Sequence, residues 1–401
     1  MDIFQDALTR WIEIDLDAIT HNITQVKEQL KEDVQVMAVV KGDAYGCGSV
    51  ACAHAAVAAG CTMLGVTTLE EALELRFQEI DVPILVFSTL LTHEVHLYVQ
   101  HHLTPTVTNA EALLTLEDIV PDDTSFPIHI KIETGMGRLG LKPEELPAFL
   151  AVLENTHNIH LAGIYTHFAK ATDRKYVKLQ AERLLEAQAV LLENGLKDFL
   201  LHACASSTYI NYPEYHFDMV RIGTLIYGQI PAGISSKLAI VDPWKVKAKV
   251  IQLNNVSSGE SIGYGRDYIA RKSISIAIIP VGLADGFSLT PPMKAKSLMD
   301  LLRIVIKEIL KYTALPLKTS NTIFFQGHPL PLIGRVGMQL LAVDASSFPE
   351  IKLGDTVELE LRRTSASPRL ARVYFKEGKV REIRSIVQNA FNEKFARGTE
   401  M

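Results

Sequence analysis

The stretch VQVMAVVKGDAYGCG, at residues 34–48, runs from an apolar segment into a glycine-rich loop, with Lys41 at the junction. The apolar segment has the length and composition of a buried strand. Seven further apolar runs, each flanked by turn or capping residues, follow before residue 225: CTMLGV (61–66), PILVFS (83–88), LTPTV (103–107), PIHIKI (127–132), IHLAGIYTH (159–167), FLLHAC (199–204) and FDMVRIG (217–223). This part of the chain therefore contains eight candidate strands.

Helical patterns separate these strands. The segment LQAERLLEAQAVLLENG (179–195) has apolar residues at helical spacing and ends on a glycine stop signal. Thr68 with Glu71 and Thr108 with Glu111 predict capping boxes, in which a hydroxyl and a carboxylate bind free backbone N–H groups. Eight strand–helix units in under 200 residues favour an α/β fold with a closed (β/α)8 TIM barrel over an open doubly wound sheet. We therefore expect catalytic groups at the C-terminal ends of the strands.

After Pro231 the pattern changes to alternating strands with turns between them, which predicts a mainly antiparallel β domain. We place the barrel at 1–232, with the first 12 or so residues able to pack on the second domain, and the β domain at 233–401. One amphipathic segment at about 294–314 predicts a helix inserted in that domain. The candidate strands of this domain are 239–256, 273–282, 322–338 and 355–362.

Composition narrows the class of protein. The 401 residues are 48% hydrophobic and 21% charged, as in a globular chain, and the net charge of −6 offers no positive field for nucleic acid or an anionic membrane. The charged N-terminus does not resemble a signal peptide, and no apolar run is long enough to span a membrane. The four cysteines are Cys47, Cys52, Cys61 and Cys204. They form no CxxC pair, which favours a reducing compartment. We expect a cytoplasmic protein with no nucleic-acid or membrane partner and no metal site.

Lys41 is the first candidate for chemistry, because it ends the first barrel strand. Partial desolvation there would lower its pKa and free the amine to form a Schiff base. Tyr45, four residues later, can turn its phenol back towards the barrel mouth. The alternative is a lysine that only extends from the rim into solvent.

The sequence GMGRLG at 135–140 matches a dinucleotide-binding pattern, but we reject that interpretation. The following helix is expected to begin near Pro143, so the third glycine precedes it and cannot pack it against the strand. No acidic residue ends a second strand at the distance that a ribose contact requires.

Eight motifs together resemble the alanine racemase family in order and spacing, over about residues 11 to 345. They are VVKGDAYG, KIETGMGRLG, THF at 166–168, HACAS, FDMVRIGTLIYG, SIGYGRDY, PVGLADGF and GRVGM. The resemblance implies a fold-type III pyridoxal-phosphate enzyme, with a barrel, a β domain and a head-to-tail homodimer that shares its active sites. It implies an isomerase that interconverts L- and D-alanine and serves D-amino acid biosynthesis.

The resemblance also implies a role for two bases. Lys41 matches the lysine that binds the cofactor and acts on one face of the substrate, and Tyr264 of the partner subunit matches the base on the opposite face. Inversion at carbon requires one base to remove the proton while the other delivers one from behind.

Further roles are carried over residue by residue. Arg221 matches the arginine facing the pyridine nitrogen, where a permanently charged donor keeps that nitrogen unprotonated. Arg138 and Met338 match substrate-binding positions, and Lys131 matches a lysine often found carbamylated. The alternative is an unmodified lysine. The remaining cofactor-binding matches are Tyr45, His167, Ser206, Gly223 and Thr224.

The departures from the family pattern concern the substrate side and the C-terminus. The usual GRVCMD is GRVGMQ at 334–339, a tyrosine of the access route is Leu283, and a C-terminal tyrosine segment is replaced by YFKEG at 374–378. Changes of this kind alter which side chain fits a pocket. Alanine remains the leading substrate. The alternatives are racemisation of serine or a basic amino acid, a related decarboxylation, and a catalytically silent cofactor-binding homologue.

Overall fold

The structure is a computed structural model that describes residues 6–289, 298–299, 301–302, 305–306 and 322–385. The chain divides into two compact units. One is Asp15–Pro243, and the other joins the described residues before Asp15 to those from Trp244 onward. Most of the predicted helix at 294–314 and the polar C-terminal tail lie outside the described residues.

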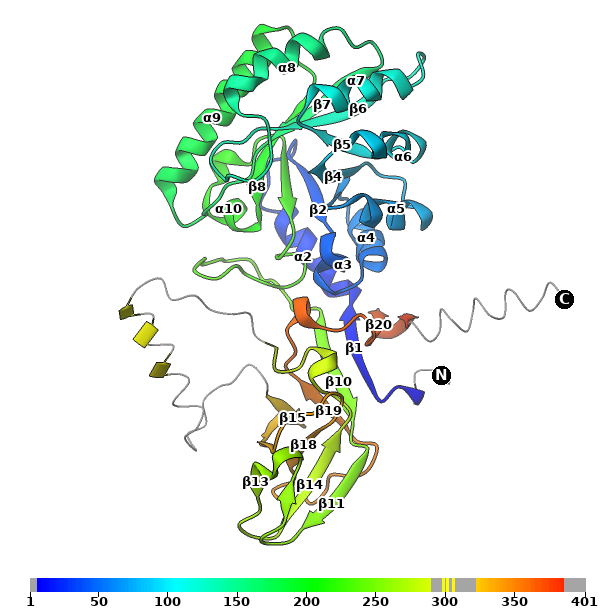
Figure 1. Cartoon of the computed structure of the whole chain (residues 1–401), viewed down its shortest axis with the longest axis vertical. Coiled ribbons are helices and arrows are strands. Elements are labelled where there is room, and N and C mark those ends of the chain that lie inside the picture. Colours follow the sequence, from blue (N-terminus) through cyan, green and yellow to red (C-terminus); the bar gives the residue numbers. More distant parts are fainter. Residues whose placement is uncertain (1–5, 290–297, 300, 303–304, 307–321, 386–401) are drawn as a thin grey trace, which may run out of the picture. The chain divides into compact units, whose positions relative to one another are not determined.

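The first unit contains a closed barrel of eight parallel strands, so the predicted TIM barrel is confirmed (Figure 1). The first and last strands close it, with Gln35 paired to Met219. Met37, Leu85 and Tyr165 belong to the buried cluster in this unit, as expected for a packed barrel core. The strands are β2 (Gln35–Val39), β3 (Met63–Val66), β4 (Ile84–Thr89), β5 (Thr104–Val107), β6 (Phe126–Lys131), β7 (Ile159–Tyr165), β8 (Leu200–Ala205) and β9 (Met219–Ile222).

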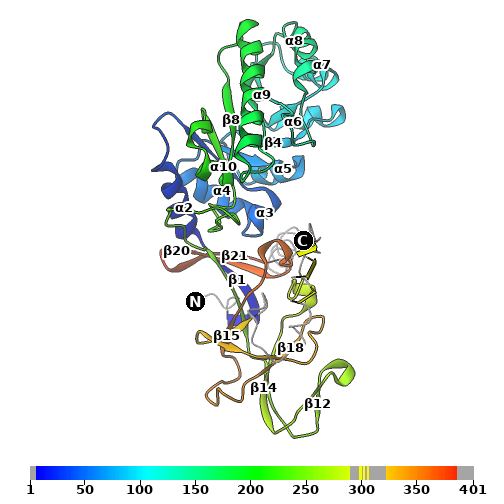
Figure 2. The same ribbon diagram turned by 90° about the vertical axis from the view of Figure 1, so that its left-hand side faces the viewer.

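Helices follow the strands and cover the outside of the barrel, and Figure 2 shows the longest of them, α9, running beside the strands. The helices of this unit are α2 (Leu16–Lys27), α3 (Lys41–Tyr45), α4 (Ser49–Ala58), α5 (Leu69–Phe77), α6 (Val95–Gln100), α7 (Ala110–Ile119), α8 (Leu146–Leu153), α9 (Arg174–Glu193) and α10 (Ser206–Asn211). None of the helices in the described part of the chain combines the length and apolarity needed to cross a membrane.

One predicted capping box is confirmed and the other is wrong. Thr68 and Glu71 form the box that begins α5. Helix α7 is instead capped by Asn109, whose side chain accepts the backbone N–H of Ala112 at 2.8 Å. The hydroxyl of Thr108 lies 2.6 Å from that of Thr89, so it bonds the neighbouring strand end rather than the helix.

The second unit is built from antiparallel sheets. A seven-stranded sheet has the order β16-β15-β19-β10-β1-β20-β21, a four-stranded sheet has the order β11-β14-β18-β17, and β12 pairs with β13. The strands are β1 (Arg10–Asp15), β10 (Trp244–Lys249), β11 (Gln252–Val256), β12 (Ser261–Ile262), β13 (Tyr268–Ile269), β14 (Ile274–Ile279), β15 (Ile323–Phe325), β16 (His328–Leu330), β17 (Leu332–Ile333), β18 (Leu341–Asp344), β19 (Thr356–Leu359), β20 (Ala371–Lys376) and β21 (Lys379–Arg384).

One predicted strand begins later than expected, and one segment left without a structural prediction is now placed. Residues 239–243 are not a strand, because their backbone is bound by α2: the side chain of Asn22 bonds both the N–H and the carbonyl of Val241. The segment at 374–378, which does not align with the family pattern, closes the hairpin of β20 and β21.

Candidate active site

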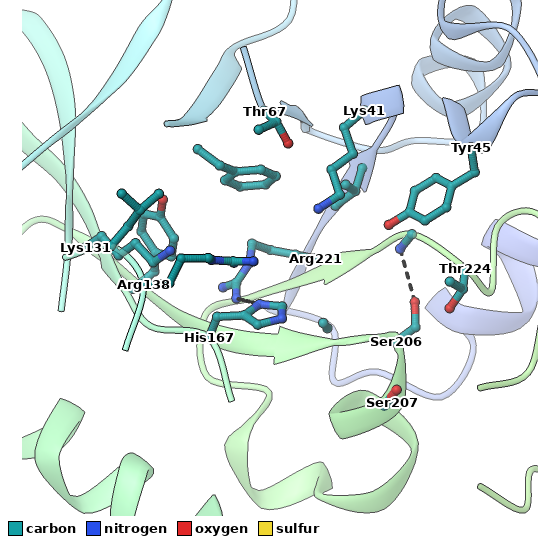
Figure 3. A pocket seen from close by; sticks show the side chains of 16 residues that line it. Lys41, Tyr45, Thr67, Lys131, Arg138, His167, Ser206, Ser207, Arg221 and Thr224 are labelled. Atoms are coloured by element: carbon teal, nitrogen blue, oxygen red, sulfur yellow. Dashed lines mark hydrogen bonds between the residues drawn. The ribbon is translucent and has the colours of Figure 1, made fainter. Parts of the chain in front are cut away.

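A cavity of about 370 Å³ opens at the C-terminal ends of the barrel strands (Figure 3). Lys41 follows β2, Lys131 ends β6, His167 follows β7, Ser206 follows β8 and Arg221 lies in β9. The structure therefore brings together nine residues singled out from the sequence: Lys41, Tyr45, Lys131, Arg138, His167, Ser206, Arg221, Gly223 and Thr224.

The side chains of Lys41 and Tyr45 both point into this pocket from the two ends of one turn (Figure 3). Gly42, Asp43, Ala44 and Tyr45 all have positive φ, between 52° and 61°, so the turn is left-handed. Such a conformation costs an L-residue roughly 1–2 kcal/mol. Strain of this kind persists only where surrounding contacts fix the backbone, and it is typical of functional sites.

The pocket is strongly cationic. Lys41, Lys131, Arg138 and Arg221 all line it, and none of the described lining residues is acidic. Burial, and then Arg138, lowers the pKa of Lys41, while burial followed by Arg138 and Arg221 lowers the pKa of Lys131 to about 8. The site is therefore suited to an anionic ligand and contains an amine that is more easily deprotonated than an exposed lysine.

Arg221 is buried and held by a chain of imidazoles. Its Nη1 lies 2.8 Å from Nδ1 of His202, and Nε2 of His202 lies 3.0 Å from Nδ1 of His129. Burial and then Arg221 lower the pKa of both histidines, that of His129 to about 3, so both rings are neutral. Because arginine only donates, His202 must carry its proton on Nε2 and donate to His129. His129 then carries its proton on Nε2, a buried atom with no partner among the described residues.

This chain of imidazoles depends on Gly163 in β7. A Cβ at that position would lie 2.4 Å from the His129 ring. Nη2 of Arg221 donates to the backbone carbonyls of Thr166 at 2.7 Å and Ala203 at 2.9 Å. The guanidinium is therefore fixed in one orientation in the pocket wall.

Hydroxyl and amide groups gather at the opposite side of the pocket. The N–H of Gly223 donates to Oγ of Ser206 at 3.1 Å, and the buried hydroxyl of Thr224 has no partner among the described residues. A Cβ at Gly223 would lie 2.5 Å from the Tyr45 hydroxyl, so only glycine leaves this space open. Burial raises the pKa of Tyr45, which keeps its phenol protonated as a donor. These groups form a cradle for an anionic oxygen.

The glycine-rich loop at 135–140 does not bind phosphate in the way its pattern suggests. The carboxylate of Glu133 accepts the backbone N–H groups of Gly135 at 2.6 Å and Arg138 at 3.0 Å. Those N–H groups are therefore already satisfied, in agreement with rejecting the dinucleotide interpretation. The loop instead carries Arg138 to the pocket.

Tyr264 and Met338 do not line this pocket. Both lie in the second unit and are exposed, at 75% and 67%. They are near each other there, because a Cβ at Gly337 would lie 3.8 Å from the Tyr264 ring. Asp267 and Arg335 form an ion pair between the same two loops.

Several lining residues were missed from the sequence. Thr67 and Phe87 lie at the ends of β3 and β4, where the strand-end rule could have found them. His129 and His202, which do not line the pocket but support Arg221, were missed as well, because they lie inside their strands and no local motif distinguishes them from core residues. The other unpredicted lining residues are Val39, Leu139, Tyr165, Ala205 and Ser207.

Solved structures of alanine racemases are similar to this chain over most of its length. The alanine racemase of Clostridium difficile 630 has a TM-score of 0.82 and 26% identity, with 94% of this chain and 99% of that one covered. The Bacillus anthracis alanine racemase with bound L-Ala-P has a TM-score of 0.79 and 28% identity, covering 95% of this chain and 98% of that one.

Sequence relatives agree with this. The alanine racemase of Nostoc sp. is 32% identical over 87% of this chain and 86% of its own length, and that of Clostridium tetani is 32% identical over 94% and 98%. The profile of the alanine racemase N-terminal domain matches residues 14–231, and that of the C-terminal domain matches residues 244–306. The chain therefore belongs to the alanine racemase family.

Proposed function

We propose that this chain is a pyridoxal-phosphate-dependent racemase that interconverts L- and D-alanine in the cytoplasm. The observation that carries the proposal is the cationic pocket, in which an amine of lowered pKa lies between a buried arginine and a cradle of hydroxyl and amide groups. Its four cysteines are buried in the barrel unit, which agrees with a reducing compartment.

The residues of the pocket fit the proposed cofactor. The space at Gly223 and the unpartnered hydroxyl of Thr224 suit a phosphate, together with Tyr45 and Ser206. Lys41 supplies an amine for a carbonyl, and Arg221 can only donate, which suits a ring nitrogen that accepts. His167 also lines the pocket, and its Nδ1 lies 3.4 Å from Nη2 of Arg221.

The proposed mechanism divides proton transfer between two residues. When bound, pyridoxal phosphate supplies an electron sink that makes the α-proton of the amino acid acidic. The Lys41 amine, whose pKa burial lowers, takes or returns the proton on one face. Tyr264 of the partner subunit does so on the other face, and Arg138 holds the substrate carboxylate together with the backbone of Met338.

A homodimer follows from this assignment. Tyr264 and Met338 do not line the pocket of their own chain, and both are exposed. We propose that the two subunits associate head to tail and that each pocket is completed by the other subunit.

Lys131 is proposed to be carbamylated. Its lowered pKa favours the neutral amine, which attacks carbon dioxide to form a carbamate while its proton passes to solvent. The new negative charge would lie among Arg138, Arg221 and Lys41, and it would offset their mutual repulsion.

Exchange at the α-carbon tests the proposed function. Purified protein with pyridoxal phosphate is incubated in deuterated water with a panel of L- and D-amino acids, followed by mass spectrometry and chiral separation. We expect deuterium incorporation with inversion, fastest for alanine, and its loss in Lys41→Ala. Exchange by Lys41→Ala at the wild-type rate would refute the proposal, and release of carbon dioxide without inversion would favour a decarboxylase.

A further inference from the structure

We propose that Glu71 is a positioning residue for Lys41: its carboxylate ties the turn after β2 to the end of β3 and holds the lysine amine in the pocket. The inference rests on the proposed function, because it concerns the lysine assigned to the cofactor. Glu71 does not line the pocket.

The two carboxylate oxygens of Glu71 have different partners. Oε1 accepts the N–H of Gly42, the residue next to Lys41, at 2.6 Å. Oε2 accepts the N–H of Thr67 at 2.8 Å and that of Thr68 at 3.3 Å. Thr67 and Lys41 both line the pocket, so one side chain joins two parts of its rim.

This arrangement exceeds what a helix cap requires. A capping box needs the carboxylate to bond only the N-cap residue, which is Thr68 here. The bond to Gly42 reaches a different loop, and charge-assisted bonds to a carboxylate are stronger than neutral ones. The additional bond therefore serves the turn that carries Lys41.

The turn itself needs external support, because it is left-handed at Asp43, Ala44 and Tyr45. Its internal bonds include Ala44 N–H to Val40 at 2.8 Å, and Asp43 accepts the N–H of Ser49 at 2.9 Å. The first of these bonds lies within the turn, and the second joins the turn to α4. Glu71 adds a bond from outside both, because it lies in α5 and bonds the turn directly after Lys41.

Glu71 also contributes charge. Burial, Arg138 and Arg221 lower the pKa of Lys41, whereas Glu71 raises it. Lys131 and His167 lie close enough to interact with the same amine. Removing the charge of Glu71 should therefore lower the pKa of Lys41. Shortening its side chain should instead disturb the position of the amine.

Three variants separate these effects. Glu71→Gln removes the charge and one acceptor, and Glu71→Asp keeps the charge but is one methylene too short to join both loops. Glu70→Gln is the matched control, since it makes the same change one residue earlier on a fully exposed side chain. The full chain is freed of cofactor with hydroxylamine and compared across the variants.

Two readouts do not require turnover. The pKa of Lys41 is measured by competitive labelling with acetic anhydride between pH 6 and 11, read by peptide mass spectrometry. The rate of pyridoxal phosphate association is measured by stopped-flow absorbance. We expect Glu71→Gln to lower the pKa of Lys41 and to slow association about tenfold. Glu71→Asp should keep a near wild-type pKa and still associate slowly.

The inference is overturned if Glu71→Gln and Glu71→Asp match Glu70→Gln in both readouts. If Glu71→Gln does not fold, wild-type association by Glu71→Asp alone overturns the positioning role. The proposed function fails separately: Lys41→Ala would then bind cofactor with an unchanged absorbance band and exchange the α-proton, whatever Glu71 does.

Discussion

At the scale of single residues, the pocket is organised by cations whose neighbours decide their protonation. Lys41 and Lys131 are partly desolvated and close to Arg138 and Arg221, so both have lowered pKa values. Arg221 instead remains the charged donor that sets the tautomers of His202 and His129. The site thus combines easily deprotonated amines with a guanidinium that cannot serve as a base.

Carbamylation of Lys131 should depend on pH in a way set by its environment. Only the neutral amine reacts, so the carbamate should increase as the pH rises through about 8, rather than through the 10.5 of an ordinary lysine. The measurement is the carbonyl signal in ¹³C NMR after equilibration with ¹³C-bicarbonate. Lys131→Met is the control and should lack the signal. Absence of a carbonyl signal from the wild-type protein at pH 8–9 would show that Lys131 remains an amine.

Lys41 and Tyr45 were predictable from their place after a strand, whereas the other predicted pocket residues were named from the family resemblance of their motifs. Glu71 was predicted only as part of a capping box, and its bond to Gly42 could not be inferred from a spacing of 29 residues. His129 and His202 were missed for the same reason: their pairing exists only once β6 and β8 stand in one barrel.

At the scale of elements, local sequence decides most boundaries, and competing hydrogen bonds decide the rest. The Thr68–Glu71 box begins α5 as its spacing predicts. Thr108 has the same spacing to Glu111, yet Asn109 caps α7 because the Thr108 hydroxyl bonds Thr89 across neighbouring strands. A capping pattern therefore predicts a helix start more reliably than it predicts the capping residue.

The two candidate caps of α7 can be compared directly. Asn109→Ala should lower the free energy of unfolding by about 1 kcal/mol, since it leaves the N–H of Ala112 without its side-chain acceptor. Thr108→Val, which removes only the hydroxyl, should leave the cap intact. Both are measured by urea unfolding, with Thr68→Ala as a reference for losing a true cap. A larger loss for Thr108→Val than for Asn109→Ala would contradict the assignment.

At the scale of the whole molecule, the proposed active site needs two chains. Nine predicted residues meet in one pocket of the barrel unit, whereas Tyr264 and Met338 lie exposed in the other unit. If Tyr264 serves the pocket of the partner subunit, each active site combines Lys41 of one chain with Tyr264 of the other. A substitution of Lys41 in one chain and of Tyr264 in its partner then affects the same site.

Mixing two inactive variants tests this sharing. Lys41→Ala and Tyr264→Phe homodimers are each expected to be nearly inactive, because each lacks one of the two bases at both sites. In a heterodimer of the two, one site carries both substitutions and the other carries neither. Refolding an equal mixture should therefore restore about a quarter of the wild-type activity.

The rate of alanine racemisation is measured by chiral analysis after refolding. Each variant refolded alone is the control. Recovery no greater than that of the separate variants would mean that each pocket uses the Tyr264 of its own chain, or that no dimer forms.

The sequence by itself determined the barrel, the β strands that follow it and the place of Lys41 and Tyr45, because strand periodicity and strand-end positions are local properties of the chain. The other pocket residues were named through the family resemblance of its motifs. Only the tertiary structure decided which groups support that pocket. The bond between Glu71 and Gly42 joins α5 to the turn after β2, and the Arg221–His202–His129 chain joins three different strands. Such contacts form only after the barrel closes, when partners from different segments compete for the same hydrogen bonds. No single segment of the sequence encodes that competition.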